Sequence, residues 1–234
     1  MIQTVRTFVV VPAAGLGERF GSGTAKQYAD LNGAPVLAHT LDRLGAIRCE
    51  RTFVVVAMDD GEYEQRIGRR DGIEVLRCGG ATRAATVRNA MAALTSHCKS
   101  DDWMLVHDAV RPCVPRDALA RLVRELADDD VGGLLAIPVA DTLKRAAADR
   151  AMDTENRESL WQAQTPQMFR YSLLAAALSR DKQAAFTDEA QAVEQLAATG
   201  ACAPPRLVRG SIVNLKITYS EDLALATAIL AMQK

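Results

Sequence analysis

The chain has 234 residues, 49% of them hydrophobic and 24% charged, which is typical of a globular protein of one large domain or two small ones. Its 28 basic and 29 acidic residues give a formal net charge of -1. This balance argues against the basic patches or tails of nucleic-acid-binding and membrane-surface proteins, so we expect neither kind of partner.

The chain alternates between apolar segments and amphipathic ones. The first apolar run begins after Arg6 and is closed by Pro12. It is too short to cross a membrane and short for a secretory signal, so a strand is the better interpretation. The predicted strands are Thr7 to Val11, Thr52 to Ala57, Ile73 to Leu76, Met104 to His107 and Leu134 to Pro138. The predicted helices are Val36 to Leu44, Thr86 to Leu94, Pro115 to Ala127, Leu173 to Leu178 and Glu221 to about Met232.

This alternation predicts an α/β, Rossmann-like fold in three layers, with a mostly parallel sheet covered by helices on both faces. Ser220 is the predicted N-cap of the last helix, because an acidic pair follows it. In open parallel sheets ligands bind beyond the carboxyl ends of the strands. Candidate site residues are therefore expected in the loops that follow the strands.

Residues 139–161 break the alternation, because they are polar and weakly periodic. Alternating residues from Ala140 to Ala146, and a second segment from Glu158 to Ala163, predict two antiparallel strands that leave the body as an arm. A disordered loop is the alternative. We expect a single domain over residues 1–234, with the arm at about 139–161.

Small residues and glycines follow the first predicted strand, in Pro12-Ala13-Ala14-Gly15-Leu16-Gly17-Glu18-Arg19. Small side chains let the backbone approach a ligand closely, and glycines permit turns that point N–H groups at phosphate oxygens. Arg19 and, seven residues later, Lys26 add the positive charge that a triphosphate requires. The loop therefore predicts a grip on a nucleoside triphosphate.

Three kinds of phosphate loop compete for this segment. No glycine precedes Lys26, which excludes a Walker A motif. A dinucleotide fingerprint fits poorly, because its third glycine would be Gly21, one residue late, and no acidic residue follows the second strand before Asp59. AAGxGxR followed by Lys26-Gln27 is the pattern of nucleotidyltransferases that act on sugar phosphates and similar alcohol phosphates. A glycine-rich turn with solvated cations is the remaining alternative.

Further strings lie at strand ends and in irregular regions: Gly79 to Val87 (GGATRAATV), Val106 to Pro112 (VHDAVRP), Asp141 to Lys144 with Arg157, Thr187 to Ala190 (TDEA) and Asn214 to Thr218 (NLKIT). With the first loop, this set closely resembles the 2-C-methyl-D-erythritol 4-phosphate cytidylyltransferases of non-mevalonate isoprenoid synthesis. The resemblance runs from Pro12 to the final helix. It implies a single nucleotidyltransferase domain.

The resemblance implies an enzyme that transfers CMP from CTP to 2-C-methyl-D-erythritol 4-phosphate, giving 4-diphosphocytidyl-2-C-methyl-D-erythritol and pyrophosphate. The attacking group is a phosphate monoester, mostly dianionic at neutral pH, so no general base is needed. The protein must supply positioning and charge neutralisation at the α-phosphorus. By the resemblance, Arg19 and Lys26 are the catalytic residues. The implied nucleotide-binding residues are Ala13, Ala14, Gly15, Gly17, Gly79, Gly80, Thr86 and Asp108.

Asp108 is an acid expected beside the triphosphate. It would repel phosphates unless a divalent cation or hydroxyl groups lay between, so it is a candidate ligand of Mg²⁺ or another divalent cation, or a partner of ribose or substrate hydroxyls. We expect the metal to be bound mainly through the CTP phosphates. An ordinary loop or helix-terminal carboxylate is the alternative. Arg111 would orient Asp108 or the substrate, and His107 is expected in the core.

The implied residues for the methylerythritol phosphate are Arg111, Thr142, Arg157, Thr187 and Lys216. In the family the arm crosses to a second subunit, so the resemblance implies a homodimer in which Arg157 and Thr142 serve the neighbour's site. Lys144, also on the arm, is either part of this set or a solvated charge. Thr187 could act from the partner subunit or be a helix N-cap, since two acidic residues follow it.

Five scattered cysteines form no CxxC pair and no metal-ligand cluster with the three histidines, which predicts reduced thiols and a cytoplasmic location. Two other functions stay open at this point. One is a cytidylyltransferase for another polyol phosphate, such as ribitol 5-phosphate. The other is a non-catalytic nucleotide-binding regulator, against which the cations Arg19, Lys26 and Lys216 argue.

Overall fold

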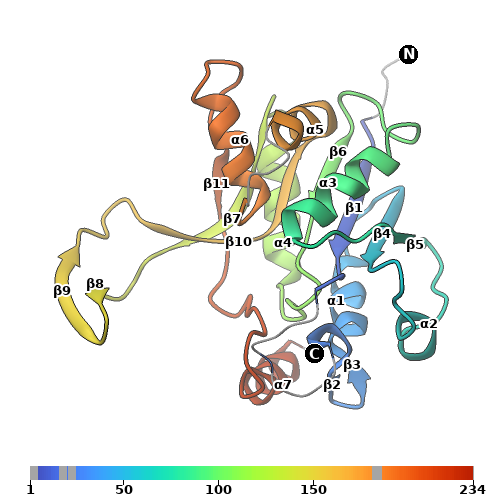
Figure 1. The fold of residues 1–234 in the computed structure, drawn as a ribbon, viewed down its shortest axis with the longest axis horizontal. Helices are drawn as coiled ribbons and strands as arrows, with labels where there is room; N and C mark the ends of the chain where they lie inside the picture. Colours follow the sequence, from blue (N-terminus) through green and yellow to red (C-terminus); the bar gives the residue numbers. More distant parts are fainter. Residues whose placement is uncertain (1–4, 16–19, 21–24, 181–185, 234) are drawn as a thin grey trace.

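The computed structural model describes residues 5–15, 20, 25–180 and 186–233. Its centre is a seven-stranded sheet in the order β11-β7-β10-β6-β1-β4-β5 (Figure 1). These strands are β1 (Thr7–Pro12), β4 (Arg51–Val56), β5 (Ile73–Arg77), β6 (Trp103–Val106), β7 (Gly132–Pro138), β10 (Trp161–Arg170) and β11 (Arg206–Arg209). All neighbouring strands are parallel except β10, which runs antiparallel between β6 and β7. The predicted mostly parallel α/β sheet is confirmed.

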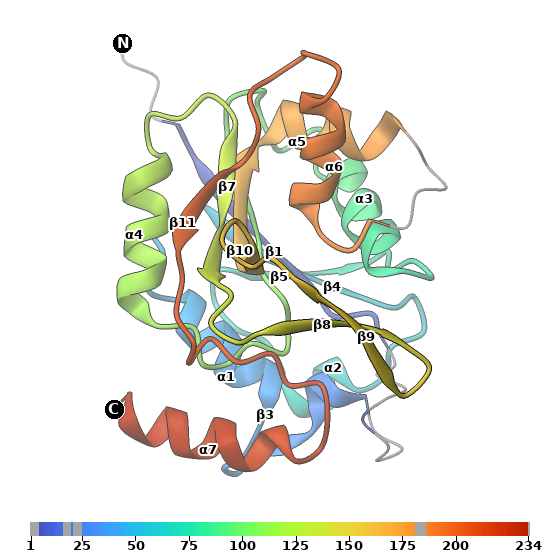
Figure 2. The same cartoon turned by 90° about the vertical axis from the view of Figure 1, so that its left-hand side faces the viewer.

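Helices cover both faces of the sheet, as Figure 2 shows with the sheet seen close to edge-on. The helices are α1 (Val36–Leu44), α2 (Tyr63–Arg66), α3 (Arg83–Ala93), α4 (Arg116–Leu126), α5 (Tyr171–Arg180), α6 (Glu189–Ala197) and α7 (Asp222–Met232). The buried residues of α3, α5 and α6 pack on one face, and those of α1 and α4 pack on the other. The strands are near-continuously apolar because both of their faces are buried.

The alternation of side chains along β1 shows how the two cores are separated. Phe8 and Val10 belong to the core under α3 and α5, whereas Val9 and Val11 belong to the core under α1 and α4. Successive side chains of a strand point to opposite faces, so one strand supplies both cores. A third cluster, which includes Val36, Val110 and Ile217, packs under α7.

Smaller elements position the loops near the sheet. A two-stranded ribbon, β2 (Asp30–Leu31) with β3 (Ala34–Pro35), lies between the first loop and α1. A single 3-10 turn, Lys26–Tyr28, precedes it. Among the residues that the structure describes, no helix combines the length and the apolar character needed to span a bilayer.

The arm is confirmed as an antiparallel hairpin, β8 (Leu143–Ala147) with β9 (Arg150–Glu155), which projects from the body (Figure 1). The prediction of its returning strand was wrong. That strand is Arg150–Glu155 and not Glu158 to Ala163, because the chain turns back at Ala148, which adopts a left-handed φ of 48°. Residues from Trp161 onward instead begin β10 and pair with the end of β7.

Several helix starts also differ from the predictions, among them that of α5, which begins at Tyr171 and not at Leu173. Helix α3 begins at Arg83 and not at Thr86, because the Thr82 hydroxyl caps it by accepting from the Ala85 N–H. Ser220 does not cap α7; the Asp222 carboxylate instead accepts from the backbone N–H groups of Thr218 and Tyr219. The N-cap of α6 is Asp188 and not Thr187.

Candidate active site

A cavity of about 740 Å³ opens at the carboxyl edge of the sheet, beyond the ends of β1, β4, β5 and β6. Most of the residues predicted to bind the nucleotide and its phosphates line it: Ala13, Ala14, Gly15, Lys26, Gly80, Thr86 and Asp108. Lys216, predicted to bind the acceptor phosphate, lines it too. Arg83 and Asp59, which had no predicted role, line it as well. Gly17 and Arg19 lie outside the described residues.

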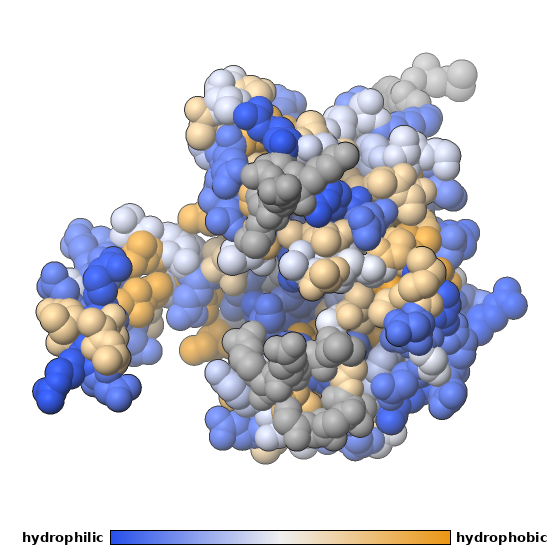
Figure 3. All heavy atoms as spheres, viewed as in Figure 1, coloured by the Kyte–Doolittle hydropathy of each residue, from blue (hydrophilic) through white to orange (hydrophobic). Residues whose placement is uncertain are grey.

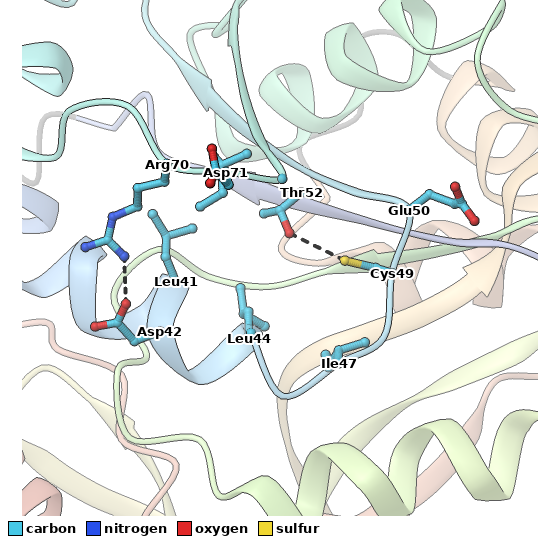
Figure 4. Close-up of a pocket in the computed structure, with 12 residues that line it drawn as sticks. Leu41, Asp42, Leu44, Ile47, Cys49, Glu50, Thr52, Arg70 and Asp71 are labelled. Carbon is cyan, nitrogen blue, oxygen red and sulfur yellow. Dashed lines mark hydrogen bonds and ion pairs between the residues drawn. The ribbon is translucent and has the colours of Figure 1, made fainter.

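A second cavity, of about 600 Å³, lies at the opposite, amino edge of the sheet, between the end of α1 and the starts of β4 and β5 (Figure 4). None of the predicted site residues lines it. Its cation, Arg70, is already paired with Asp42 at 2.7 Å. Asp71 and Glu50 add further negative charge to the lining, which disfavours a phosphate ligand. The cavity at the carboxyl edge is therefore the candidate site.

Two loops meet closely at one wall of the candidate site. A Cβ atom on Gly79 would lie 2.4 Å from the Cβ of Ala14 and 2.8 Å from the carbonyl oxygen of Val56. One on Gly80 would lie 2.6 Å from the Cβ of Ala85. Only glycine allows this approach, so the two glycines hold the first loop against the turn that starts α3. The Thr86 hydroxyl accepts from the Gly80 N–H at 3.0 Å and braces the same turn.

The turn that carries Lys26 is anchored on both sides. The Gln27 side chain is buried and donates to the carbonyl oxygen of Ala13 at 2.8 Å. The Tyr28 hydroxyl donates to the Asp60 carboxylate at 2.8 Å. Burial and this bond to Asp60 raise the pKa of Tyr28, so it stays a donor. Lys26 is thus presented to the cavity from a backbone held by two buried side chains.

Asp108 sits at the centre of a cluster of three cations. Its Oδ1 accepts from Nε of Arg83 at 2.9 Å, and its Oδ2 lies 3.0 Å from Nζ of Lys216 and 3.4 Å from Nε of Arg111. Only 7% of the Asp108 side chain is exposed. Burial would raise the pKa of Asp108, but the charges of Arg83, Lys216 and Arg111 outweigh it and hold the pKa well below its usual range. The carboxylate therefore stays ionised.

His107 is fully buried beside Asp108, as predicted for a core histidine. Its Nε2 lies 3.2 Å from the Arg111 carbonyl oxygen, which can only accept, so Nε2 carries the proton. Its Nδ1 then accepts from the Thr165 hydroxyl at 3.0 Å, and that hydroxyl in turn accepts from the Asp108 N–H. Burial lowers the pKa of His107 to about 4. The ring is therefore neutral and positions Asp108, with no path to act as a base.

The sequence is similar to known proteins over nearly its whole length. The family model described as 2-C-methyl-D-erythritol 4-phosphate cytidylyltransferase matches residues 7–232. The chain belongs to this family. It is similar to the Laribacter hongkongensis protein of the same name, with 52% identity over 230 residues, which cover 97% of each chain. It is also similar in sequence to the Dechloromonas aromatica protein of that name, with 50% identity over 98% of this chain and 99% of that one.

A solved structure has the same fold over nearly the whole chain. It is a crystal structure of the Francisella tularensis 2-C-methyl-D-erythritol 4-phosphate cytidylyltransferase, with a TM-score of 0.80 and 32% identity. The match covers 96% of this chain and 99% of that one. The mixed α/β fold with a central, mostly parallel sheet therefore matches a solved structure of this family.

The structure does not bring every predicted residue of this cytidylyltransferase into the cavity. Thr142 and Arg157 are exposed on the arm, where a terminal nitrogen of Arg157 donates to the carbonyl oxygen of Ala140. Thr187 is exposed, and its hydroxyl donates to the Gln191 side chain at 3.2 Å. Arg111 lies behind Asp108 and donates to the Asn214 carbonyl oxygen at 2.7 Å. Within one described chain, the acceptor-side residues are thus divided between the cavity and the arm.

Two members of the charged cluster had no predicted role. Arg83 is the first residue of α3, and its guanidinium bridges Asp108 and Glu189. The signal for Arg83 was present in the sequence, since Thr82 after a strand end is a helix N-cap that places the next residue at the carboxyl edge. Glu189, one residue after the cap Asp188, gave no comparable signal.

The described residues include no group of three or more His, Cys, Asp or Glu side chains arranged to hold a metal ion. Asp108 offers one carboxylate, and both of its oxygens already accept from cationic side chains. Mg²⁺ commonly binds through one or two carboxylates together with substrate phosphates. The donor set here therefore fits a cation that arrives with phosphates, and not one held by a cage of protein ligands.

The depressed pKa of His107 predicts a dependence of stability on pH. The folded chain keeps His107 neutral down to about pH 4, whereas the unfolded chain takes up a proton below about pH 6.5. The free energy of unfolding should therefore fall by about 3 kcal/mol between pH 6.5 and 4 through this residue alone. Urea unfolding at several pH values measures this free energy. Its fall with pH should be smaller for His107→Gln than for wild type. For the control His97→Gln it should equal that of wild type. Equal falls for wild type and His107→Gln would contradict this.

Proposed function

We propose that the chain transfers CMP from CTP to 2-C-methyl-D-erythritol 4-phosphate, with release of pyrophosphate, in isoprenoid biosynthesis. The observation that carries this proposal is that two lysines from distant parts of the chain, Lys26 and Lys216, line one cavity with the start of helix α3. The reaction joins two phosphate groups that repel each other, so it needs cations on both. A helix N-terminus adds a further favourable field for phosphate oxygens.

The nucleotide occupies the wall made by the first loop and the Gly79-Gly80 turn. The N–H of Ala13 donates to Val55 and that of Gly79 donates to Val56, so these two peptide groups hold the wall in shape. The surface of this wall is formed by small residues, Ala14, Gly15 and Gly80. A pyrimidine and its ribose lie against it. Lys26, together with Arg19, then neutralises the triphosphate and the charge that develops at the α-phosphorus.

The acceptor phosphate binds near Lys216, whose side chain is 40% exposed and turned toward Asp108. The acceptor attacks the α-phosphorus as a dianion, so the buried and neutral His107 is not needed as a base. Asp108 holds Lys216 in place and offers its carboxylate edge to hydroxyl groups. Mg²⁺ bound to the CTP phosphates would supply further charge neutralisation there.

We propose that the arm completes the site of a second subunit. A two-stranded hairpin is only marginally stable alone, so packing against a partner would account for an ordered arm that stands off the body (Figure 3). Its strands carry the exposed Met152, and its base carries the exposed Leu160 and Trp161. In such a homodimer, Arg157 and Thr142 reach the neighbour's acceptor phosphate, and Thr187 lies close to the same group. The cytoplasmic location remains a prediction.

The function is tested by pyrophosphate release from each of the four NTPs with methylerythritol phosphate or ribitol 5-phosphate. We expect turnover only with CTP, methylerythritol phosphate and a divalent cation. Preference for ribitol 5-phosphate would assign the chain to another polyol phosphate. CTP binding with no turnover on either acceptor would make it a nucleotide-binding regulator. Both of these outcomes contradict the proposal.

The arm's role is tested by complementation between two inactive variants in the same assay. We expect Lys26→Ala to lose at least about a hundredfold in turnover, since it removes a preorganised donor to the developing charge. Arg157→Ala should lose at least about tenfold through misplacement of the acceptor. Arg150→Ala, at an exposed arginine on the same arm, is the matched control and should stay active.

Co-expression of the two variants should restore activity. In a mixed dimer, one site has both Lys26 and the partner's Arg157, so random pairing should recover about a quarter of wild-type turnover. Recovery to no more than the average of the two variants would show that each Arg157 serves its own chain. A monomer by light scattering would contradict the arm's role as well.

A further inference from the structure

The guanidinium of Arg83 is held between two carboxylates. Its two terminal nitrogens donate to Oε1 and Oε2 of Glu189 at 2.6 and 2.9 Å, and its Nε donates to Oδ1 of Asp108 at 2.9 Å. A guanidinium has five N–H donors, of which these bonds use three. Arg83 lines the cavity, but Glu189 does not and is only 1% exposed. The two bonds of Glu189 to Arg83 therefore link this buried carboxylate to the lining of the cavity.

Glu189 is itself fixed by the sheet. It lies in the first turn of α6, whose N-cap Asp188 accepts from the N–H of Gln191. The buried Gln167 of β10 donates to the Asp188 carboxylate at 2.9 Å and accepts from the N–H of Ala190 at 2.8 Å. These two bonds bracket Glu189 on either side. The Glu189 carboxylate is thus held in one position. The Arg83 side chain is longer and partly exposed, so it is the member of the pair that can move.

A buried charge pair of this kind contributes little to stability on its own. Taking both charges out of water costs about as much as their attraction returns, and apolar residues of the same size often serve as well. Burial raises the pKa of the Glu189 carboxyl, and the charge on Arg83 opposes that rise. Stability therefore does not account for the Arg83–Glu189 pair. The orientation in which Glu189 holds the Arg83 side chain offers a functional reason for it.

Without Glu189, the terminal nitrogens of Arg83 would be unpaired cationic donors at a cavity for phosphates. They would turn toward the nearest phosphate oxygens, because charge-assisted bonds to phosphate are strong. Nε of Arg83 would then leave Oδ1 of Asp108. The carboxylate would keep only its bonds through Oδ2, to Lys216 and Arg111, and could rotate about them.

We propose that Glu189 is a positioning residue for cytidylyl transfer: its two-pronged bond keeps Arg83 on Asp108 and off the nucleotide phosphates. This inference rests on the proposed function of the same cavity. Asp108 then keeps one orientation, and Lys216 stays where the acceptor phosphate needs it. In the working enzyme Arg83 then supports Asp108 and does not bind phosphate.

The test compares Glu189→Gln with wild type in turnover and in CTP binding. A glutamine has the same size, but its NH₂ group would face one terminal nitrogen of Arg83, so the two-pronged bond is lost. We expect kcat to fall by about tenfold or more. We expect the Kd for CTP, from calorimetry, to stay unchanged or decrease, because the released Arg83 can reach the phosphates. A merely structural defect would weaken binding instead. The matched control is Glu194→Gln, an exposed residue on the same helix, which should change neither quantity.

Arg83→Lys tests the same bridge from its other end and leaves Glu189 in place, should Glu189→Gln fail to fold. A lysine keeps the charge but cannot bond both carboxylates in this geometry, so a similar loss of kcat is expected. Because both changes break one bridge, the double variant should be no worse than the poorer single variant within about threefold. Losses that multiply in the double variant would overturn the proposal, as would wild-type kcat in Glu189→Gln.

The two readouts separate this inference from the function on which it rests. A wild-type chain that binds CTP but turns over neither acceptor would overturn the proposed function. The Kd for CTP would then be the readout left for the role of Glu189. A Kd for Glu189→Gln clearly higher than that of wild type would overturn this role.

Discussion

The buried carboxylate of Asp108, shared among Arg83, Arg111 and Lys216, is the interaction on which the carboxyl edge of this fold depends. The three cations come from the start of α3, from the loop after β6 and from the tail after β11. A single ionised group in a place of low polarity attracts all three, and loss of the Asp108 carboxylate would leave these cations without their shared partner. The cluster thereby joins distant parts of the chain into one wall of the cavity, and it sets the position of Lys216.

The opposite wall is built from close contact and not from charge. Gly79 and Gly80 let the first loop and the start of α3 touch, while Gln27 and Thr86 bond the peptide groups between them. Several backbone groups at this edge, such as the Ala13 carbonyl and the Gly80 N–H, therefore already have hydrogen-bond partners within the protein. We expect recognition of a nucleotide here to depend on shape at one wall and on cationic side chains and a helix N-terminus at the other. That division suits a reaction in which the nucleobase is held in place while negative charge develops around the α-phosphorus.

Much of this fold could be predicted from the sequence, because strands buried on both faces are near-continuously apolar and helices such as α1 and α4 have one apolar face. Strand β10 was missed since its buried part contains Gln164, Thr165 and Gln167, whose side chains are satisfied only by tertiary partners. Edge strand β11 was missed because arginines flank its short apolar centre. In the site, the glycine and lysine motifs could be recognised from short stretches of sequence. The pairing of Arg83 with Glu189 could not. Which cation meets which carboxylate depends on the packing of α6 against β10, and no spacing in the sequence encodes that.

We expect CTP to bind at the carboxyl edge, with its phosphates between Lys26 and the start of α3 and with the Asp108 cluster intact. A crystal structure of the wild-type chain with CTP and Mg²⁺ measures this directly. The cytosine should lie against Ala14 and Gly80, and Arg83 should still be bonded to Asp108 and Glu189. CTP in the cavity at the amino edge, beside Arg70, would contradict it, as would an Arg83 that has left Asp108 to bind the triphosphate.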